Sequence, residues 1–328
     1  MSGDVKQYVV LSCDANPDYL FPLPLTCLMW QRLTNWEPRV IVVGDAADWR
    51  TAPARCATDV LMEMGITKAY SPAPPGRPRS LWAQMARLYA CRLFEDEADD
   101  ALRLMTADAD MWPLSRDFFD RRNDGYDVQL LGAGAYDHET PIKWPLSYVA
   151  GTLGVWRELM GRGGDERIEE AMARDMGREL PADADAMTCW LFDELFLARR
   201  LRAMDQFAER AQPVFRDGGA QGGRFWIGGP GSAVFGRCDR GDWRWPVPQR
   251  RRAHGVAGGA IDAHLDRPGW TERNWGRYLR VLTDLLPAED VARAVEYHAA
   301  FVEAMEKGEG KRNDCRRDAE AAENDRTD

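Results

Sequence analysis

The stretch that organises the chain covers residues 101–114 and reads Ala101-Leu102-Arg103-Leu104-Met105-Thr106-Ala107-Asp108-Ala109-Asp110-Met111-Trp112-Pro113-Leu114. Its apolar run, from Leu102 to Thr106, is typical of a buried strand. Two carboxylates follow it, and then Pro113, which cannot continue a central β-ladder. Residues two apart in an extended chain point to the same side, so the sequence predicts that Asp108 and Asp110 converge at the end of a strand.

Two carboxylates held this close repel each other, and one binds a proton unless a cation lies between them. A hard divalent ion whose shell is completed by phosphate oxygens suits such a pair. The spacing alone is weak support, because Asp183 and Asp185 share it but follow Pro181 without an apolar run, as in a helix start with an Asp as N-cap. The alternative for Asp108 and Asp110 is a surface turn; the strand before them favours a metal–diphosphate site.

Composition excludes several classes of protein. The 328 residues suffice for one large domain or two small ones, and 45% hydrophobic with 29% charged residues is ordinary for a globular protein. A net charge of −10 argues against general binding of nucleic acid. The chain shows neither a membrane-spanning run nor a signal-peptide pattern at Met1. Seven scattered cysteines without zinc spacing predict reduced thiols and a cytoplasmic location.

The segments before residue 101 alternate between strand-like and helix-like patterns. Strand-like runs cover residues 7–12, 39–43 and 69–70, and helix-like runs cover residues 25–34, 58–64 and 80–92, the last with Ser80 as its cap. This order is typical of doubly wound α/β proteins, in which ligands bind outside the carboxyl ends of the strands. We therefore expect the Asp pair at that edge of the sheet.

A second pair of carboxylates lies in a predicted long helix over residues 184–204. Apolar side chains, including Met187 and Trp190, cover nearly its whole circumference, so the helix is predicted to be buried on most sides. Asp193 and Glu194 lie in its middle, and a buried carboxylate must be paired or functional. Arg199 or Arg200 are the salt-bridge partners that the sequence offers for an ordinary structural role.

The C-terminal part is predicted to hold a short strand over residues 260–265, a helix from Thr271 to Leu286 and an amphipathic helix that opens at Pro287. From Lys307 onward the chain is charged and nearly without large apolar side chains, which predicts a disordered tail. Residues 213–259 are rich in Gly, Pro, Arg and Trp and suit loops that wrap a site.

Several of these motifs together resemble the GT-A-fold glycosyltransferases in order and spacing over residues 7–270. They are the N-terminal strand and loop, Ser80-xxx-Gln84-xx-Arg87, the strand end Thr106 to Met111, Trp190-xx-Asp193-Glu194 and His264-Leu265-x-Arg267-Pro268. The resemblance is to the superfamily and to no particular subfamily. It implies an α/β fold with a GT-A-like doubly wound mixed sheet flanked by helices. The domains it implies are a catalytic domain at 1–270, helices packed on it at 271–306 and the tail at 307–328.

The resemblance also implies an activity and a site. The activity is a hexosyltransferase-type transfer from a nucleotide diphosphate donor, usually a UDP-sugar, to a hydroxyl of a glycan, protein or small molecule, assisted by Mn²⁺ or Mg²⁺. The superfamily's metal ligands map to Asp108, Asp110 and His264. Its catalytic acceptor-side acid maps to Asp193 or Glu194. The donor-binding residues it implies are Ser12, Asp14, Tyr19, Ser80, Gln84, Arg87, Asp108, Ala109, Asp110 and Arg267.

Two rival functions share parts of this pattern. A sugar-1-phosphate nucleotidyltransferase would need a Gly-rich phosphate loop directly after the first strand, and residues 12–17 contain no glycine. A non-catalytic nucleotide-sugar-binding protein of the same fold is disfavoured by the presence of both carboxylates together with His264. The sequence leaves open whether transfer inverts or retains the configuration of the sugar.

Overall fold

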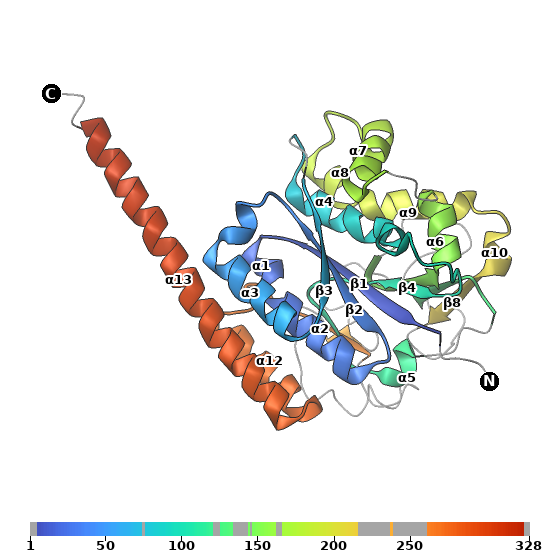
Figure 1. Ribbon diagram of the computed structural model, residues 1–328, viewed down its shortest axis with the longest axis horizontal. Coiled ribbons are helices and arrows are strands. Elements are labelled where there is room, and N and C mark those ends of the chain that lie inside the picture. Colours follow the sequence, from blue (N-terminus) through green and yellow to red (C-terminus); the bar gives the residue numbers. More distant parts are fainter. Residues whose placement is uncertain are drawn as a thin grey trace.

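A seven-stranded sheet forms the centre of the computed structural model, in the order β3-β2-β1-β4-β7-β6-β8 (Figure 1). The structure describes residues 5–73, 76–120, 125–133, 144, 146–161, 166–215, 237–238 and 261–324, with backbone alone for 132–133, 215, 237–238 and 308–324. The strands are β1 (Gln7–Asp14), β2 (Glu37–Val43), β3 (Thr67–Ser71), β4 (Arg103–Thr106), β6 (Val128–Ala133), β7 (Val149–Thr152) and β8 (Ala211–Phe215). The sheet is mixed, because β7 runs antiparallel to β4 and β6 while the other neighbours pair in parallel.

Helices cover both faces of this sheet, as predicted for a doubly wound α/β fold. One core contains residues of α2 (Pro22–Leu33), α3 (Ala52–Glu63), α12 (Glu272–Leu285) and α13 (Ala288–Asn324). The other contains residues of α4 (Arg79–Ala86), η2 (Arg87–Phe94), α6 (Leu153–Met160), α7 (Ile168–Glu179), α8 (Ala186–Trp190) and α9 (Phe192–Ala203). Side chains alternate along β1, so Val9 and Leu11 enter the first core while Tyr8 and Val10 enter the second.

Shorter elements connect these layers. They are α1 (Pro17–Leu20), η1 (Asp48–Arg50), α5 (Arg116–Phe119), η3 (Leu146–Tyr148) and α10 (Phe207–Arg210). A small second sheet contains β5 (Met111–Pro113), β10 (Asp262–His264) and β9 (Arg237–Cys238), in the order β5-β10-β9. Pro113 therefore lies on an edge strand, where a missing N–H is tolerated. The antiparallel pairing places His264 opposite Met111, and Met111 directly follows the Asp pair in the sequence.

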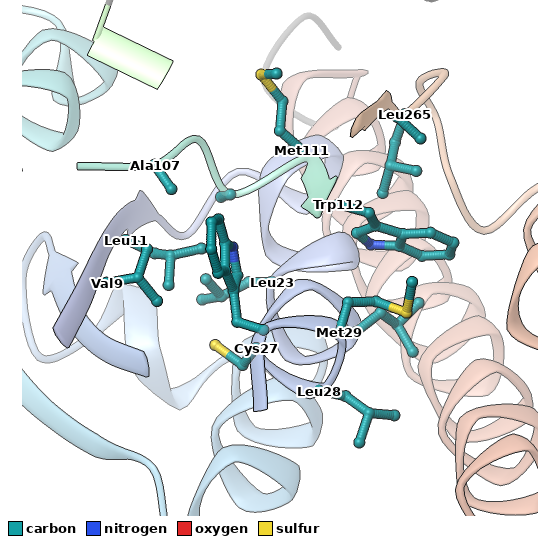
Figure 2. Packing of buried hydrophobic residues seen from close by; sticks show 14 of the residues in the cluster. Val9, Leu11, Leu23, Cys27, Leu28, Met29, Ala107, Met111, Trp112 and Leu265 are labelled. Atoms are coloured by element: carbon teal, nitrogen blue, oxygen red, sulfur yellow. The ribbon is translucent and has the colours of Figure 1, made fainter. Parts of the chain in front are cut away.

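The organising stretch is anchored in the first core. Figure 2 shows Ala107, Met111 and Trp112 there, together with Val9 of β1 and Leu265, which follows β10. Trp112 is fully buried, and burial of a side chain of this size contributes about 2–3 kcal/mol. The turn that carries the two carboxylates is thus held at both ends by buried apolar side chains.

The predicted long helix over 184–204 is divided, and this prediction was wrong in part. Leu191 takes φ −94° and ψ 0°, outside the helical region, and separates α8 from α9. Because α8 is a separate short helix, Met187 is 63% and Trp190 45% exposed, and neither is in the core. The predicted cap by an Asp of this triplet is confirmed: it is Asp185, whose carboxylate accepts a hydrogen bond from the Thr188 amide at 2.7 Å.

The disorder expected from Lys307 stays a prediction; α13 is described as a helix as far as Asn324 and extends away from the sheet (Figure 1). Ala, Glu, Lys and Arg dominate this segment and are strong helix formers, so helix can continue there without a core. In the described part of the chain, no helix is both long enough and apolar enough to cross a bilayer. The five cysteines with described side chains are free thiols, as expected.

Candidate functional site

The predicted carboxylates lie on a turn between β4 and β5, at the carboxyl edge of the parallel strands. The Met111 amide donates to the carbonyl of Asp108 at 3.3 Å, so the chain turns here and is not extended as predicted. The two carboxylates still lie close enough for the charge of Asp110 to act on the pKa of Asp108. Thr26 donates its hydroxyl proton to the carbonyl of Ala109 at 2.7 Å, and the Leu265 amide donates to the carbonyl of Asp110 at 2.9 Å. These bonds fix the turn from two sides, and each carboxylate has its own set of neighbours.

Asp108 is held by a cation and a hydroxyl group. Arg87 donates to its Oδ1, and the Ser147 hydroxyl donates to its Oδ2 at 2.8 Å. Burial acts to raise the pKa of Asp108, but the charge of Arg87 and the hydrogen bonds from Arg87 and Ser147 together hold the pKa below its ordinary value. Asp108 is therefore ionised at neutral pH, and its side chain remains 28% exposed.

Arg87 lies at the start of η2 and connects the two predicted carboxylate pairs. Its guanidinium donates to the carbonyl of Ala107 at 3.1 Å, to Asp108 and to Asp193 Oδ2 at 3.2 Å. Burial acts to lower its pKa, whereas the two carboxylates raise it, and the net direction is upward. The donor-binding role of Arg87 stays a prediction; in the structure its side chain is buried and its guanidinium is paired with two carboxylates.

Asp193 is buried near the start of α9. Its Oδ1 accepts the Glu194 amide at 2.8 Å, and burial raises its pKa despite the nearby Arg87. The partners expected from the sequence were wrong: Arg199 pairs with Glu179 at 2.9 Å, and Arg200 with Asp175 at 3.3 Å. Glu194 is half-buried beside Asp193.

A third cluster of side chains surrounds the buried carboxylate of Asp110. His264 Nε2 and Arg267 Nε each lie 3.7 Å from Asp110 Oδ2. The Arg267 guanidinium also packs over the ring of Tyr19, 4.3 Å from its centre. The structure thus brings together Asp110, His264, Arg267 and Tyr19, which lie up to 248 positions apart along the chain (267 − 19).

Two of the three predicted metal ligands form a suitable pair. A carboxylate oxygen and an imidazole nitrogen 3.7 Å apart are the donor types that bind Mn²⁺; the Asp110 side chain is buried, and that of His264 is 21% exposed. Asp108 is bonded to Arg87 and Ser147 instead. Within the described ranges no three His, Cys, Asp or Glu side chains are grouped as a metal site. The residues present therefore fit an ion at Asp110 and His264 better than at Asp108.

The other predicted donor-binding residues lie around the same edge. Ser12 donates its hydroxyl proton to the carbonyl of Ala83, and Gln84 reaches the carbonyl of Trp190 at 3.5 Å. Asp14 ends β1, accepts the Asn16 amide at 3.2 Å, and has its pKa raised by burial.

Some sequence-based expectations at this edge need correction or lie beyond the described part. α4 begins at Arg79 after Pro78, so the predicted cap by Ser80 is wrong, although Ser80 remains on α4. Most of the 213–259 loop lies outside the described residues. Reasoning from the sequence missed Ser147 and Thr26, and neither lies in a pattern that signals a site.

Comparisons with known proteins give distant similarities of structure only. No family model and no curated protein matches the sequence. The glycosyltransferase GlyE of Streptococcus pneumoniae TIGR4 is 10% identical over 65% of this chain and 46% of its own, with a TM-score of 0.35. The galactosyltransferase LgtC in complex with donor and acceptor sugar analogues is 13% identical over 86% and 98%, with a TM-score of 0.43. Mouse xyloside xylosyltransferase 1 is 10% identical over 79% and 97%, with a TM-score of 0.39. The chain spans about half the length of GlyE.

Proposed function

We propose that this protein is a metal-dependent glycosyltransferase, which moves a sugar from a nucleotide diphosphate donor to a hydroxyl acceptor. A UDP-sugar is the favoured donor, and Mn²⁺ or Mg²⁺ the favoured ion. The observation that carries the proposal is the approach of His264 and Arg267, each 3.7 Å from Asp110, at the carboxyl edge of the parallel strands. An acid, an imidazole and a cation together suit a diphosphate that carries a divalent ion.

The chemistry of glycosyl transfer assigns roles to these residues. The sugar passes through an oxocarbenium-like state while negative charge grows on the leaving diphosphate. A divalent ion bound at Asp110 and His264 would offset this charge as a Lewis acid. Arg267 is partly exposed beside Asp110 and can add a hydrogen-bonding cation to the same phosphate oxygens. Asp108 and Arg87 would then hold the turn in a fixed position relative to α9.

Asp193 is the residue that we propose on the acceptor side. Burial raises its pKa, which makes its carboxylate a stronger base than an exposed one. Its proximity to Arg87 and Asp108 joins it to the same edge of the sheet. Glu194, directly beside it, is the alternative base.

A substitution at Asp193 separates chemistry from donor binding. Asp193→Asn is expected to keep the donor dissociation constant while lowering kcat by roughly a hundredfold or more, because a general base is lost. The measurements are donor titration calorimetry and steady-state turnover. Glu194→Gln is the matched neighbour: normal turnover in Asp193→Asn with loss in Glu194→Gln would assign the role to Glu194. Unfolding of Asp193→Asn would instead show that the residue serves only its ion pair with Arg87.

A thermal-shift screen tests the proposed function directly. Nucleotide sugars and free nucleotides are added with and without Mn²⁺, and a ligand of the native state at about 100 times its Kd adds about 2.7 kcal/mol of stability. We expect Tm to rise with a nucleotide diphosphate sugar and to rise further with Mn²⁺. Unchanged Tm across all nucleotides, with and without metal, would contradict both the transferase and the non-catalytic binder.

A further inference from the structure

The loop of residues 264–270 faces the candidate site on one side and the C-terminal helices on the other. His264 and Arg267 approach Asp110. Alternate carbonyl groups of the same loop are held by side chains of α12 and α13. Tyr278 donates to the carbonyl of Asp266, Asn274 to that of Pro268 at 2.9 Å, and His298 to that of Trp270 at 2.9 Å. The backbone of this loop is therefore held by side chains of the C-terminal helices.

His298 is the contact that α13 makes to the loop. A carbonyl can only accept, so the hydrogen bond from Nε2 to the Trp270 oxygen assigns the proton to Nε2. The imidazole also stacks on Trp275 of α12, with ring centres 4.4 Å apart and an interplanar angle of 3°. One side chain thus links α13, α12 and the loop.

The loop is also packed tightly against the end of α1. A Cβ at Gly269 would lie 2.8 Å from Cδ1 of the fully buried Phe21, so only glycine permits this approach. Tyr297 of α13 stacks on Phe21 at 5.5 Å and donates its hydroxyl proton to the Phe21 carbonyl at 3.0 Å. Because Tyr19 of α1 lies under the Arg267 guanidinium, the loop, α1 and α13 form one packed unit.

The described part of α13 is itself firmly attached. At its start, the fully buried Asp290 accepts two hydrogen bonds from Arg32 of α2, at 2.6 Å and 3.0 Å. Bidentate charge-assisted pairs of this kind are the strong ones. Further along, Phe301 is fully buried against Phe21 and Trp270. The helix can therefore act as a fixed support.

We propose that α13, acting through His298, is a positioning element that holds loop 264–270 in the geometry at which His264 and Arg267 face Asp110. His298 touches neither of these side chains, so it acts through the backbone of the loop. The consequence for donor affinity rests on the proposed function, whereas the ordering of the loop does not.

Two substitutions of His298 separate its hydrogen bond from its stacking. His298→Phe keeps a ring on Trp275 but removes the donor, and His298→Gln keeps an N–H donor. In His298→Phe we expect faster hydrogen–deuterium exchange in peptides covering 264–270 and roughly tenfold weaker binding of UDP with Mn²⁺, as for loss of a buried hydrogen bond. His298→Gln should restore both. Glu296→Gln, at an exposed position of α13, is the control and should change neither.

The outcomes distinguish the inference from the proposed function. Unchanged exchange of 264–270 in His298→Phe overturns the inference, whether or not UDP binds. Faster exchange in a protein that binds no nucleotide with Mn²⁺ supports positioning and removes the proposed function. If His298→Phe fails to fold, His298→Leu removes the donor to the Trp270 carbonyl with a side chain of similar volume instead. In that variant faster exchange confined to the loop supports the inference, and unchanged exchange overturns it.

Discussion

Replacing Arg87 with methionine is expected to lower the free energy of unfolding by about 3–5 kcal/mol at neutral pH, the usual cost of removing one partner of a buried ion pair. Methionine fills similar volume without charge, so Asp108 and Asp193 would face each other without the cation that now binds both. Arg79→Met is the matched control. Arg79 pairs with Asp45 and Asp48 but is 46% exposed, and we expect a loss below about 1 kcal/mol.

The effect of Arg87→Met should depend on pH with a definite sign. In the wild type the pKa of Asp108 is lowered, so its contribution is present above the unfolded-state pKa and is lost as pH falls through the folded-state value. Without Arg87, burial and mutual repulsion raise the pKa of both carboxyls in the folded state. Such groups stabilise below their unfolded-state pKa and lose that contribution as pH rises through the folded-state value.

Urea unfolding at about pH 7 and at about pH 4.5, which is just above the ordinary Asp pKa of about 3.9, measures this difference. We expect the gap in stability between wild type and Arg87→Met to narrow at the lower pH. A gap of equal size at both values, or a loss no greater than that of Arg79→Met, would show that the two carboxylates do not depend on Arg87.

The layout of the sheet could be predicted from the sequence because it depends on local patterns. The apolar runs at 7–12 and 39–43 became β1 and β2, and the short edge at 69–70 became β3. The Asp pair lies at the predicted edge because β4 ends at Thr106, where the apolar run from Leu102 ends. The Asp185 cap was also predictable, since its hydrogen bond spans only three residues.

The arrangement within the site could not be predicted in the same way. Arg87, Asp108 and Asp193 come from three separate segments, and no periodicity indicates which cation meets which acid. Arg199 and Arg200 were closer in sequence to Asp193, but they pair with Glu179 and Asp175 of α7. Tertiary packing decides these pairings, as it decides that α8 exposes Trp190.

The turn at 108–110 shows why the role of each carboxylate needs the structure. In an extended chain the two acids would be equivalent ligands of one ion. In the observed turn Asp108 is bound by Arg87 and Ser147, while Asp110 faces His264. The two positions are therefore expected to respond differently to substitution, with Asp110 the more sensitive one for metal binding.

Asp110→Asn is expected to abolish metal-dependent donor binding while leaving the fold intact. The amide has nearly the same shape, and the backbone bond from Leu265 to the Asp110 carbonyl does not involve the side chain. A neutral amide is a far weaker ligand for a divalent ion than a carboxylate, and the attraction to Arg267 is lost as well. Calorimetric titration with UDP should show Mn²⁺-enhanced binding in the wild type. In Asp110→Asn the affinity should equal that of the wild type in EDTA, whether or not Mn²⁺ is present.

Asp185→Asn is the control that the chain itself offers, because Asp185 lies in the second Asp-Ala-Asp triplet. Asn caps a helix about as well as Asp does, so α8 should keep its cap and Tm should be unchanged. We expect wild-type binding of UDP and Mn²⁺ in this variant. Equal loss of binding in both variants would show that we have assigned the ion to the wrong triplet. Full Mn²⁺-enhanced binding in Asp110→Asn would remove Asp110 from the metal site and with it the observation on which the proposed function rests.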